Sequence, residues 1–385
     1  MSIILFDTPI RKNFYPITLN KSLGDVRLGI FTLKEWWQQA LNKPILLKTD
    51  DYLQPLYEEI NDSEEHLFID ASVVPDNNII HKILALQSSE AIADEFGLIA
   101  FKTSNFNNTL SEIFKKIKII DNRNFVNRIT QPFHLFQINE QILKEQFDWI
   151  IKQKQSYKIS STNVVINPEN IFIDEEANVE HCILNAQNGI IYVGKNATIM
   201  EGSIIRGSCA ILENAVIKAG TKIYGATTIG KFAVASGEIK NSIISDYSNK
   251  AHDGYLGDSF IGSWCNIGAG TNNSNVKNNF NEIFLYKEAT NEKVNAGKKC
   301  GVIMGDFTRV AINSAINTGS VYGISCNVFG NGLLPKTISN FSWGLNDKYK
   351  YSKVIEDINN WMYFKGKQLS DAEIIVLKYI FDNNL

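Results

Sequence analysis

The second half of the chain repeats its hydrophobic pattern with a period of six residues. Small or turn-forming residues fill the gaps between regularly spaced aliphatic positions. A helix would show a period near 3.6 and a single strand a period of 2, so neither element alone explains the pattern. A six-residue period is typical of a parallel β-helix, in which each unit forms one short strand and a turn. We therefore predict that these side chains fill the centre of a three-sided prism. The unbroken run comprises Val193, Ile199, Ile205, Ile211, Ile217, Ile223 and Ile229.

The same pattern extends the predicted β-helix from Val164 to about Leu334 in several phases. The chain between Val276 and Lys299 loses the period and is polar, which indicates a loop with a small hairpin thrown out of one coil. Loops of this kind often carry function on a rigid scaffold. The other inward positions that the period predicts are Ile173 and Val179, then Tyr255, Ile261 and Ile267, then Met304, Val310, Ile316, Tyr322 and Val328.

The first half of the chain has the pattern of an α/β domain. Short apolar runs alternate there with stretches of helical spacing. The predicted strands are Ile3–Phe6, Ile45–Leu47, Leu67–Ile69 and Leu98–Phe101, and the predicted helices are Leu33–Leu41, Ile80–Leu86 and Leu143–Gln155. We expect an α/β domain at residues 1–160 that ends in a linker helix, a β-helix at 161–340, and a helical tail at 341–385. The tail helices are expected at Tyr351–Tyr363 and Ser370–Phe381, with Ser370 as N-cap.

Composition limits the classes of partner. The net charge of −3 gives no basic surface for nucleic acid, and no apolar run approaches membrane-spanning length. The opening MSIILFDTPIRKNF has no long apolar segment of the signal-peptide type, so we expect a cytoplasmic protein. The five cysteines are scattered without metal-binding spacing, which favours buried free thiols. Only His181 and His252 lie in the predicted β-helix, which argues against a three-histidine zinc site.

The stretch from Glu238 to Asn275 interrupts the period and carries a fixed pattern. The pattern comprises Glu238, Lys240, His252, the run YLGD at 255–258, the run NIGAGT at 266–271, and Asn275. It resembles the acetyltransferase half of the bifunctional bacterial enzyme family that makes UDP-N-acetylglucosamine. The resemblance implies a left-handed β-helix that uses acetyl-CoA, and transfer of an acetyl group to glucosamine-1-phosphate. The loop that follows Asn275 departs from that family.

The resemblance also implies roles for individual residues. His252 matches the general base, and imidazole titrates near working pH, as the chemistry requires. Lys240 matches a ligand of the sugar phosphate, with Lys222 as a second charge. Backbone N–H groups of NIGAGT are candidates for stabilising an oxyanion. The remaining substrate-binding candidates are Glu238 and Asn275, for the sugar hydroxyls or the amine, and Tyr255 and Asn266, which line the sugar site.

The first thirty residues suggest the other half of the same bifunctional family. A strand is followed by Arg11, then by Pro16 and Thr18, then by Lys21 and Arg27, although the family's glycine-rich phosphate loop is missing. The order resembles a sugar nucleotidyltransferase domain, and the run QPFHLFQINEQI at 131–142 adds to the likeness. The resemblance implies that UTP binds here, with Arg11, Lys21 and Arg27 on its phosphates. Nucleotidyl transfer needs Mg²⁺ held by carboxylates, and Asp70, at the end of a strand, is the best-placed candidate, with Asp7 as a second.

These observations predict a bifunctional enzyme with an acetyltransferase and a uridylyltransferase activity. One alternative is an acyltransferase on another amino sugar with an inactive sugar-nucleotide-binding N-terminal domain. Another is a scaffold or regulatory subunit without activity. A β-helix has flat sides that need covering, and three prisms around an axis is a common closed arrangement, so we expect a homotrimer.

Overall fold

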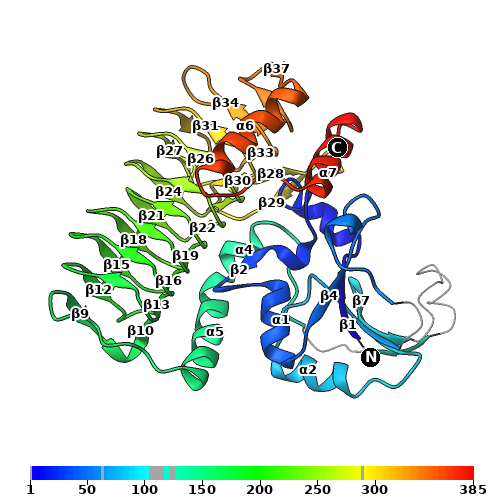
Figure 1. Ribbon diagram of the computed structural model, residues 1–385. Helices are drawn as coiled ribbons and strands as arrows, with labels where there is room; N and C mark the ends of the chain where they lie inside the picture. Colours follow the sequence, from blue (N-terminus) through cyan, green and yellow to red (C-terminus); the bar gives the residue numbers. More distant parts are fainter. Residues whose placement is uncertain (1, 62–64, 104–116, 122–125, 288–289) are drawn as a thin grey trace. The chain divides into compact units, whose positions relative to one another are not determined.

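The computed structural model describes residues 2–61, 65–103, 117–121, 126–287 and 290–385. The chain forms two compact units (Figure 1). The first consists of residues 1–14, 20–26 and 31–130, and the second of residues 15–19, 27–30 and 131–385. Helices α4 (His134–Gln137) and α5 (Asn139–Gln153), which the sequence analysis assigned to the N-terminal domain, therefore belong to the unit of the β-helix.

The first unit is built on a mixed six-stranded sheet with the order β4-β1-β5-β7-β6-β8. Strands β4, β1 and β5 are parallel, β7 runs antiparallel to both β5 and β6, and β8 is parallel to β6. The central strands read as continuous apolar runs because parallel strands are covered on both faces. The bounds are β1 (Ser2–Phe6), β4 (Ile45–Lys48), β5 (His66–Asp70), β6 (Glu90–Asp94), β7 (Gly97–Thr103) and β8 (Lys118–Asp121). The sequence analysis missed β6 and β8.

The helices of the first unit begin at polar caps. Helix α1 (Leu33–Leu41) begins with a capping box between Thr32 and Glu35, and α2 (Asn77–Leu84) is capped by Asp76. Phe6, Phe68 and Phe101 pack together in the core, with the rings of Phe68 and Phe101 stacked at 4.7 Å. The shorter elements of this part of the chain are η1 (Pro9–Phe14), η2 (Leu23–Asp25), β2 (Arg27–Leu28), β3 (Phe31–Thr32) and η3 (Gln54–Leu56).

The second unit is a parallel β-helix whose coils stack along one direction (Figure 1). A nine-stranded sheet, a ten-stranded sheet and a six-stranded sheet form its three sides. The nine-stranded sheet contains β10 (Ile171–Ile173), β13 (Ile191–Val193), β16 (Cys209–Ile211), β19 (Thr227–Ile229), β22 (Ile243–Ile244), β25 (Phe260–Ile261), β30 (Val302–Met304), β33 (Ser320–Tyr322) and β35 (Thr337–Ile338). The ten-stranded sheet contains β11 (Asn178–Val179), β14 (Thr198–Ile199), β17 (Val216–Ile217), β20 (Val234–Ala235), β23 (Asn249–Lys250), β26 (Asn266–Ile267), β31 (Arg309–Val310), β34 (Asn327–Val328), β36 (Ser342–Trp343) and β37 (Asp347–Lys348). The six-stranded sheet contains β9 (Val164–Ile166), β12 (Ile183–Asn185), β15 (Ile204–Arg206), β18 (Lys222–Tyr224), β21 (Glu238–Lys240) and β24 (Tyr255–Gly257).

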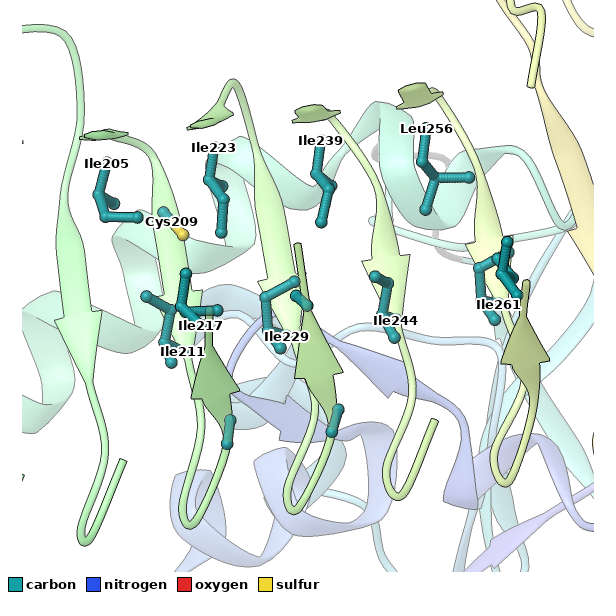
Figure 2. Packing of buried hydrophobic residues seen from close by; sticks show 14 of the residues in the cluster. Ile205, Cys209, Ile211, Ile217, Ile223, Ile229, Ile239, Ile244, Leu256 and Ile261 are labelled. Carbon is teal, nitrogen blue, oxygen red and sulfur yellow. The ribbon is translucent and has the colours of Figure 1, made fainter. Parts of the chain in front are cut away.

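The predicted aliphatic positions form the core of the prism. Figure 2 shows Ile205, Ile223, Ile239 and Leu256 following one another along one side of this core. All seven residues of the unbroken run are buried, with at most 2% of their surface exposed, and burying such a side chain stabilises a fold by about 1.5–3 kcal/mol. The interpretation of Tyr255 as an inward residue was wrong. Leu256 points inward instead, because the irregular coils shift the register by one residue and Leu256 is the apolar neighbour.

The expected interruption and tail are also present. A hairpin of β28 (Phe284–Lys287) and β29 (Glu292–Asn295) lies within the stretch that loses the period. Between the coils around it, β27 (Asn272–Asn273) pairs with β32 (Ala315–Ile316). Helix α6 is Tyr351–Tyr363, and α7 (Asp371–Asp382) begins with a capping box from Ser370 to Glu373. The expected fold class is therefore confirmed.

The cysteines and the helices bear on the classes that composition left open. All five cysteines are buried, as expected. Burial raises the pKa of Cys300 to about 12, so its thiol stays protonated near neutral pH. In the part of the chain that the structure describes, each helix is too short or too polar to cross a bilayer.

Candidate active site

Three neighbouring strands of the β-helix place the predicted substrate-binding residues on one outward surface. Strands β18, β21 and β24 pair in register, with Lys222 beside Glu238 and Glu238 beside Tyr255. The next outward column places Tyr224 beside Lys240. The residues between these columns point into the core because side chains alternate along a strand. We refer to this surface as the polar face; it consists of Lys222, Tyr224, Glu238, Lys240 and Tyr255.

Tyr224 connects the two charged residues of β21. Its hydroxyl donates a hydrogen bond to Oε1 of Glu238, and Nζ of Lys240 lies 5.7 Å from the centre of its ring. Partial burial, and after it the bond to Glu238, raises the pKa of Tyr224. The phenol therefore stays protonated and donates to the carboxylate, while its ring attracts the ammonium group. Tyr224 thus orients Glu238 and Lys240 on the polar face.

Asp258, the last residue of YLGD, holds Asn275 next to Tyr255. The carboxylate of buried Asp258 accepts hydrogen bonds from the side-chain amides of Asn241, at 2.7 Å, and of Asn275. A Cβ atom on Gly257 would lie 2.3 Å from the hydroxyl oxygen of Tyr255 and 2.8 Å from Nδ2 of Asn275. Only glycine leaves room for this approach. The structure therefore brings Asn275 to the end of the polar face.

His252 lies on an exposed turn between β23 and β24, where the ten-stranded sheet passes into the six-stranded sheet. The turn packs tightly between its neighbours along the stack. A Cβ atom on Gly254 would lie 2.1 Å from the carbonyl oxygen of Thr271, and one on Gly237 would lie 2.6 Å from that of Gly254. The turn belongs to the coil that continues into Tyr255, so His252 comes just before the polar face along the chain.

Two features that the sequence analysis assigned to the site lie elsewhere or are already bonded. Asn266 pairs with Asn249 and Arg309 in the ten-stranded sheet, so it does not share a side of the prism with Glu238. The amides of Gly268 and Gly270 donate to the carbonyl oxygens of Val310, at 2.9 Å, and Asp253, at 3.0 Å. These two glycine N–H groups of NIGAGT are therefore engaged in the stack of coils and do not serve as oxyanion donors.

The arginines assigned to nucleotide phosphates are engaged within their own units. Arg11 is buried, and its guanidinium forms ion pairs with Asp7, at 3.8 Å, and with Asp50. Arg27 binds both carboxylate oxygens of Asp246, at 3.1 and 2.9 Å, and donates to the carbonyl oxygen of Ile30. Lys21 is partly exposed and lies close enough to buried Asp25 to act on its charge. The assignment of these three side chains to phosphates stays a prediction.

The surroundings of Asp70 do not fit a divalent cation. Its Oδ1 accepts from the backbone N–H of Ser72 at 2.8 Å, and its Oδ2 accepts from the hydroxyl of Thr8 at 3.1 Å and lies 3.6 Å from a guanidinium nitrogen of Arg128. Burial raises the pKa of Asp70, although Arg128 opposes the shift. Mg²⁺ prefers several oxygen ligands, and the described residues contain no cluster of three acidic, histidine or cysteine side chains. We therefore assign no step to a metal at Asp70.

Sequence reasoning missed three residues of this site. Tyr224 lies in β18, two strands from β24 in the six-stranded sheet, and only the pairing of coils shows that it contacts Glu238. Asp258 was part of the matched run, but only the structure shows that its carboxylate binds the side chains of Asn241 and Asn275. Lys250 had a detectable signal, because it is a charged residue at an inward position of the repeat.

Parts of the chain are similar to known proteins. Residues 3–155 match the model of a family described as sugar nucleotidyl transferase. The bifunctional protein GlmU of Bartonella quintana (strain Toulouse) is 24% identical over 266 residues, which cover 65% of this chain and 51% of that protein. GlmU of Desulfitobacterium hafniense (strain DSM 10664 / DCB-2) is 32% identical over 136 residues, covering 35% of this chain and 27% of that protein. The chain thus spans about half, or less, of the length of these relatives.

Solved structures overlap mainly with part of the chain. A UDP-N-acetylglucosamine acyltransferase from Campylobacter jejuni covers 58% of this chain and 96% of its own, with 17% identity and a TM-score of 0.29. AntD, an N-acyltransferase from Bacillus cereus solved in complex with dTDP and 3-hydroxybutyryl-CoA, covers 54% and 87%, with 14% identity and a TM-score of 0.23. Overlaps at these TM-scores carry no functional argument. Parts of this chain are thus similar to GlmU proteins, and residues 3–155, which match the sugar nucleotidyl transferase family, precede the β-helix.

Proposed function

We propose that the β-helix transfers an acetyl group from acetyl-CoA to the amine of glucosamine-1-phosphate. The observation that carries the proposal is the position of His252, an exposed imidazole on the turn that leads into the polar face. The polar face offers charged and hydrogen-bonding groups of the kinds that a phosphorylated sugar requires. An amino sugar bound there would have a base beside it.

In the proposed step the sugar amine attacks the thioester carbonyl of acetyl-CoA. A C–N bond forms, His252 takes the proton from the nitrogen, and the C–S bond breaks. The thiolate of CoA leaves and takes up a proton. Proton removal by a positioned base contributes about 10²–10⁴-fold to such reactions.

The remaining residues of the polar face would bind the sugar. The ammonium groups of Lys240 and Lys222 supply positive charge for the phosphate, and Lys240 is the better oriented because the ring of Tyr224 lies beside it. Glu238 accepts hydrogen bonds from sugar hydroxyls or from the amine, as does Asn275 through its side-chain carbonyl. Tyr255 borders the same space.

Replacement of the imidazole tests this proposal. His252→Asn keeps a polar side chain but removes the base, so acetyl transfer to glucosamine-1-phosphate should fall by about 10²-fold or more. His181→Asn is the matched control, because His181 is another exposed histidine of the β-helix and should leave the rate unchanged. CoA release is measured with a thiol reagent. An unchanged rate in His252→Asn would contradict the mechanism. A wild-type protein inactive on this substrate but active on another amino sugar would favour the alternative acyltransferase, and one inactive on all of them would favour a scaffold.

For the N-terminal unit we propose uridylyl transfer from UTP to N-acetylglucosamine-1-phosphate with release of pyrophosphate, as a specific form of the sugar nucleotidyl transfer by which its matched family is described. The match over residues 3–155 favours this function, whereas the ion pair of Asp70 with Arg128 favours a domain that binds a sugar nucleotide without turnover. Pyrophosphate release with Mg²⁺-UTP separates the two. Release supports transfer. Binding of UDP-N-acetylglucosamine in a calorimeter without pyrophosphate release supports the inactive domain.

We also propose that the protein assembles as a homotrimer, since the flat sides of a parallel β-helix favour side-to-side association. Light scattering coupled to gel filtration gives the mass of the assembly. A monomeric mass over the working concentration range would contradict this expectation.

A further inference from the structure

One inward column of the β-helix contains a charged residue. Along the ten-stranded sheet, Ile199, Ile217 and Ala235 follow one another in register, and Lys250 pairs with Ala235 on the next coil. Ile267 occupies the corresponding position on the coil after that. Only 2% of Lys250 is exposed. Burying an ammonium group among aliphatic side chains is costly unless it is paired with hydrogen-bond acceptors.

The ammonium group of Lys250 is bound by two backbone carbonyl groups. Its Nζ donates to the carbonyl oxygen of Ser236 at 3.1 Å and to that of His252 at 2.7 Å. The neighbouring inward residue, Ala235, is small and leaves room for the long side chain. The side chain of Lys250, which lies on β23, therefore contacts the turn that follows this strand and connects it to the preceding coil.

The turn that carries His252 is held at three consecutive carbonyl groups. The oxygen of Asp253 accepts from the amide of Gly270 at 3.0 Å, and that of Gly254 accepts from the amide of Glu238 at 3.1 Å. Both are backbone bonds between coils. The carbonyl of His252 itself is held by the side chain of Lys250. The bond next to the imidazole is thus a charge-assisted one, and such bonds are shorter and stronger than neutral ones.

We propose that Lys250 is a positioning residue for His252, whose buried ammonium group fixes the turn so that the imidazole faces the bound amino sugar. The inference rests on the proposed acetyl transfer. Lys250 itself does not touch the substrate. This positioning role explains why a charged residue stands at an inward position that is otherwise occupied by an apolar residue.

The charge on Lys250 depends on pH in an accessible range. Burial lowers its pKa to about 8, and Asp253 on the same turn acts in the opposite direction. The strands packed on either side, β20 and β26, bring Ala235 and Ile267 next to it, and neither carries a charge. Above pH 8 the ammonium group becomes a neutral amine, and its bond to the carbonyl of His252 weakens.

The test compares Lys250→Met with Ile267→Met. The first variant keeps the length of the side chain and removes the donor, and the second alters the same inward column one coil further on. For Lys250→Met we expect kcat for acetyl transfer to fall by about 10- to 100-fold, with KM for both substrates changed by less than about two-fold, because misplacement of a reacting group acts on kcat. Ile267→Met should change kcat by less than about two-fold. Lys250→Arg, which retains a charged donor, should keep more activity than Lys250→Met.

The pH profile gives a readout that simple loss of packing does not move. The wild-type rate should fall above a pH of about 8, as Lys250 loses its proton. The rate of Lys250→Met should lack this fall. A wild-type fall that persists unchanged in the variant would overturn the role of the ammonium group.

A direct observation of the imidazole separates this inference from the proposed reaction. In protein labelled with ¹³C-histidine, the signal missing from His252→Asn identifies His252. This signal should move in Lys250→Met and stay in place in Ile267→Met. If His252→Asn abolishes transfer while Lys250→Met keeps both its rate and its histidine signal, the inference is wrong and the proposed function stands. If His252→Asn remains active, the proposed function is wrong, and the histidine signal still shows whether Lys250 holds the turn. Should Lys250→Met fail to fold, Lys250→Gln, which removes the charge but keeps a polar side chain, is measured in its place and read in the same two ways.

Discussion

The two units treat charged side chains in opposite ways. In the first unit the carboxylates of Asp7 and Asp25 are enclosed and bound to partners of the same unit. Asp7 accepts from the amide of Leu23 and from the hydroxyl of Thr49, and the hydroxyl of Tyr57 donates to Asp25. In the β-helix the charged side chains of the polar face are partly or fully exposed. Lys250, on the strand before the turn that carries His252, is buried instead.

The difference shows what each arrangement can do. A buried carboxylate whose oxygens already have partners fixes the local backbone, but it has little capacity left for a ligand. Exposed groups on a rigid sheet keep that capacity, and the sheet holds them in place. The β-helix therefore combines an open surface with a fixed geometry, which is what a binding site needs.

The largest expected effect is a loss of stability when the turn between β23 and β24 is altered. In Gly254→Ala the new Cβ would lie 2.1 Å from the carbonyl oxygen of Thr271, and the backbone φ of +128° is one that alanine rarely adopts. Strain and overpacking together should lower the free energy of unfolding by on the order of 5 kcal/mol. Thermal unfolding measures it.

Gly220→Ala is the matched control for this prediction. Gly220 also has a positive φ, of +72°, but a Cβ there would meet nothing within 4 Å. Its cost should be about 1 kcal/mol, from the backbone conformation alone. Equal losses in the two variants would mean that the close packing of the turn around His252 is not important for stability.

The second prediction concerns the buried carboxylates of the first unit. Burial raises the pKa of Asp7 from 3.8 to about 7, although its bond from Thr49 and the charge of Arg11 oppose the shift. Because the folded protein holds a proton that the unfolded chain releases, the stabilisation is fully present below pH 3.8 and is lost as pH rises towards 7. At about 1.4 kcal/mol per pKa unit the change is about 4 kcal/mol.

Asp7→Asn should remove this dependence. Its melting temperature relative to the wild type should rise between pH 4 and pH 7, because asparagine does not titrate. Asp148→Asn, at an exposed residue paired with Lys144 on the surface of α5, is the control and should follow the wild type. A parallel course of the Asp7→Asn and wild-type curves would show that Asp7 is not buried in this way.

The third prediction concerns Lys250, the buried charge of the β-helix, whose effect on stability is expected at high pH rather than at low pH. The folded-state pKa of Lys250 is lowered from 10.5 to about 8, so its contribution to stability is fully present above pH 10.5 and is lost as pH falls through 8. The change is about 3 kcal/mol over that window.

The stability of the wild type relative to Lys250→Met should therefore increase from pH 8 to pH 10. Chemical denaturation at a series of pH values measures it, with Ile267→Met as the control. No change in the difference between wild type and Lys250→Met would mean that Lys250 has the same pKa in the folded and unfolded protein, and that its ammonium group is not desolvated.

The sequence predicted the β-helix more fully than it predicted the site. The period identified the inward residues because a prism interior accepts apolar side chains at every coil. It failed at Tyr255, where the coils are irregular. Ile205 pairs with Ile223, whereas Ile239 pairs with Leu256 after a shorter step along the chain. A fixed period cannot follow coils of unequal length, so the register in the part that bears His252 needed the structure.

The candidate residues divide in the same way. The spacing of Glu238, Lys240 and Tyr255 within a matched pattern was sufficient to name them, and the register then placed them on one face. The charges of Arg11 and Arg27 looked available in the sequence, but each is bound by a carboxylate far away along the chain. Ion pairs between distant residues leave no local signal.

The sequence by itself determined the architecture, because inward apolar positions and turn residues recur with a period that only a parallel β-helix accommodates. It also determined which residue types stand at the candidate site. The tertiary structure alone decided which of them share a surface, that Asn266 lies on another side of the prism, and that Lys250 turns inward to bind the carbonyl of His252. The physical reason is that hydrophobic periodicity is a property of each coil taken singly, whereas polar contacts depend on the register between coils and on partners that the chain brings together only on folding.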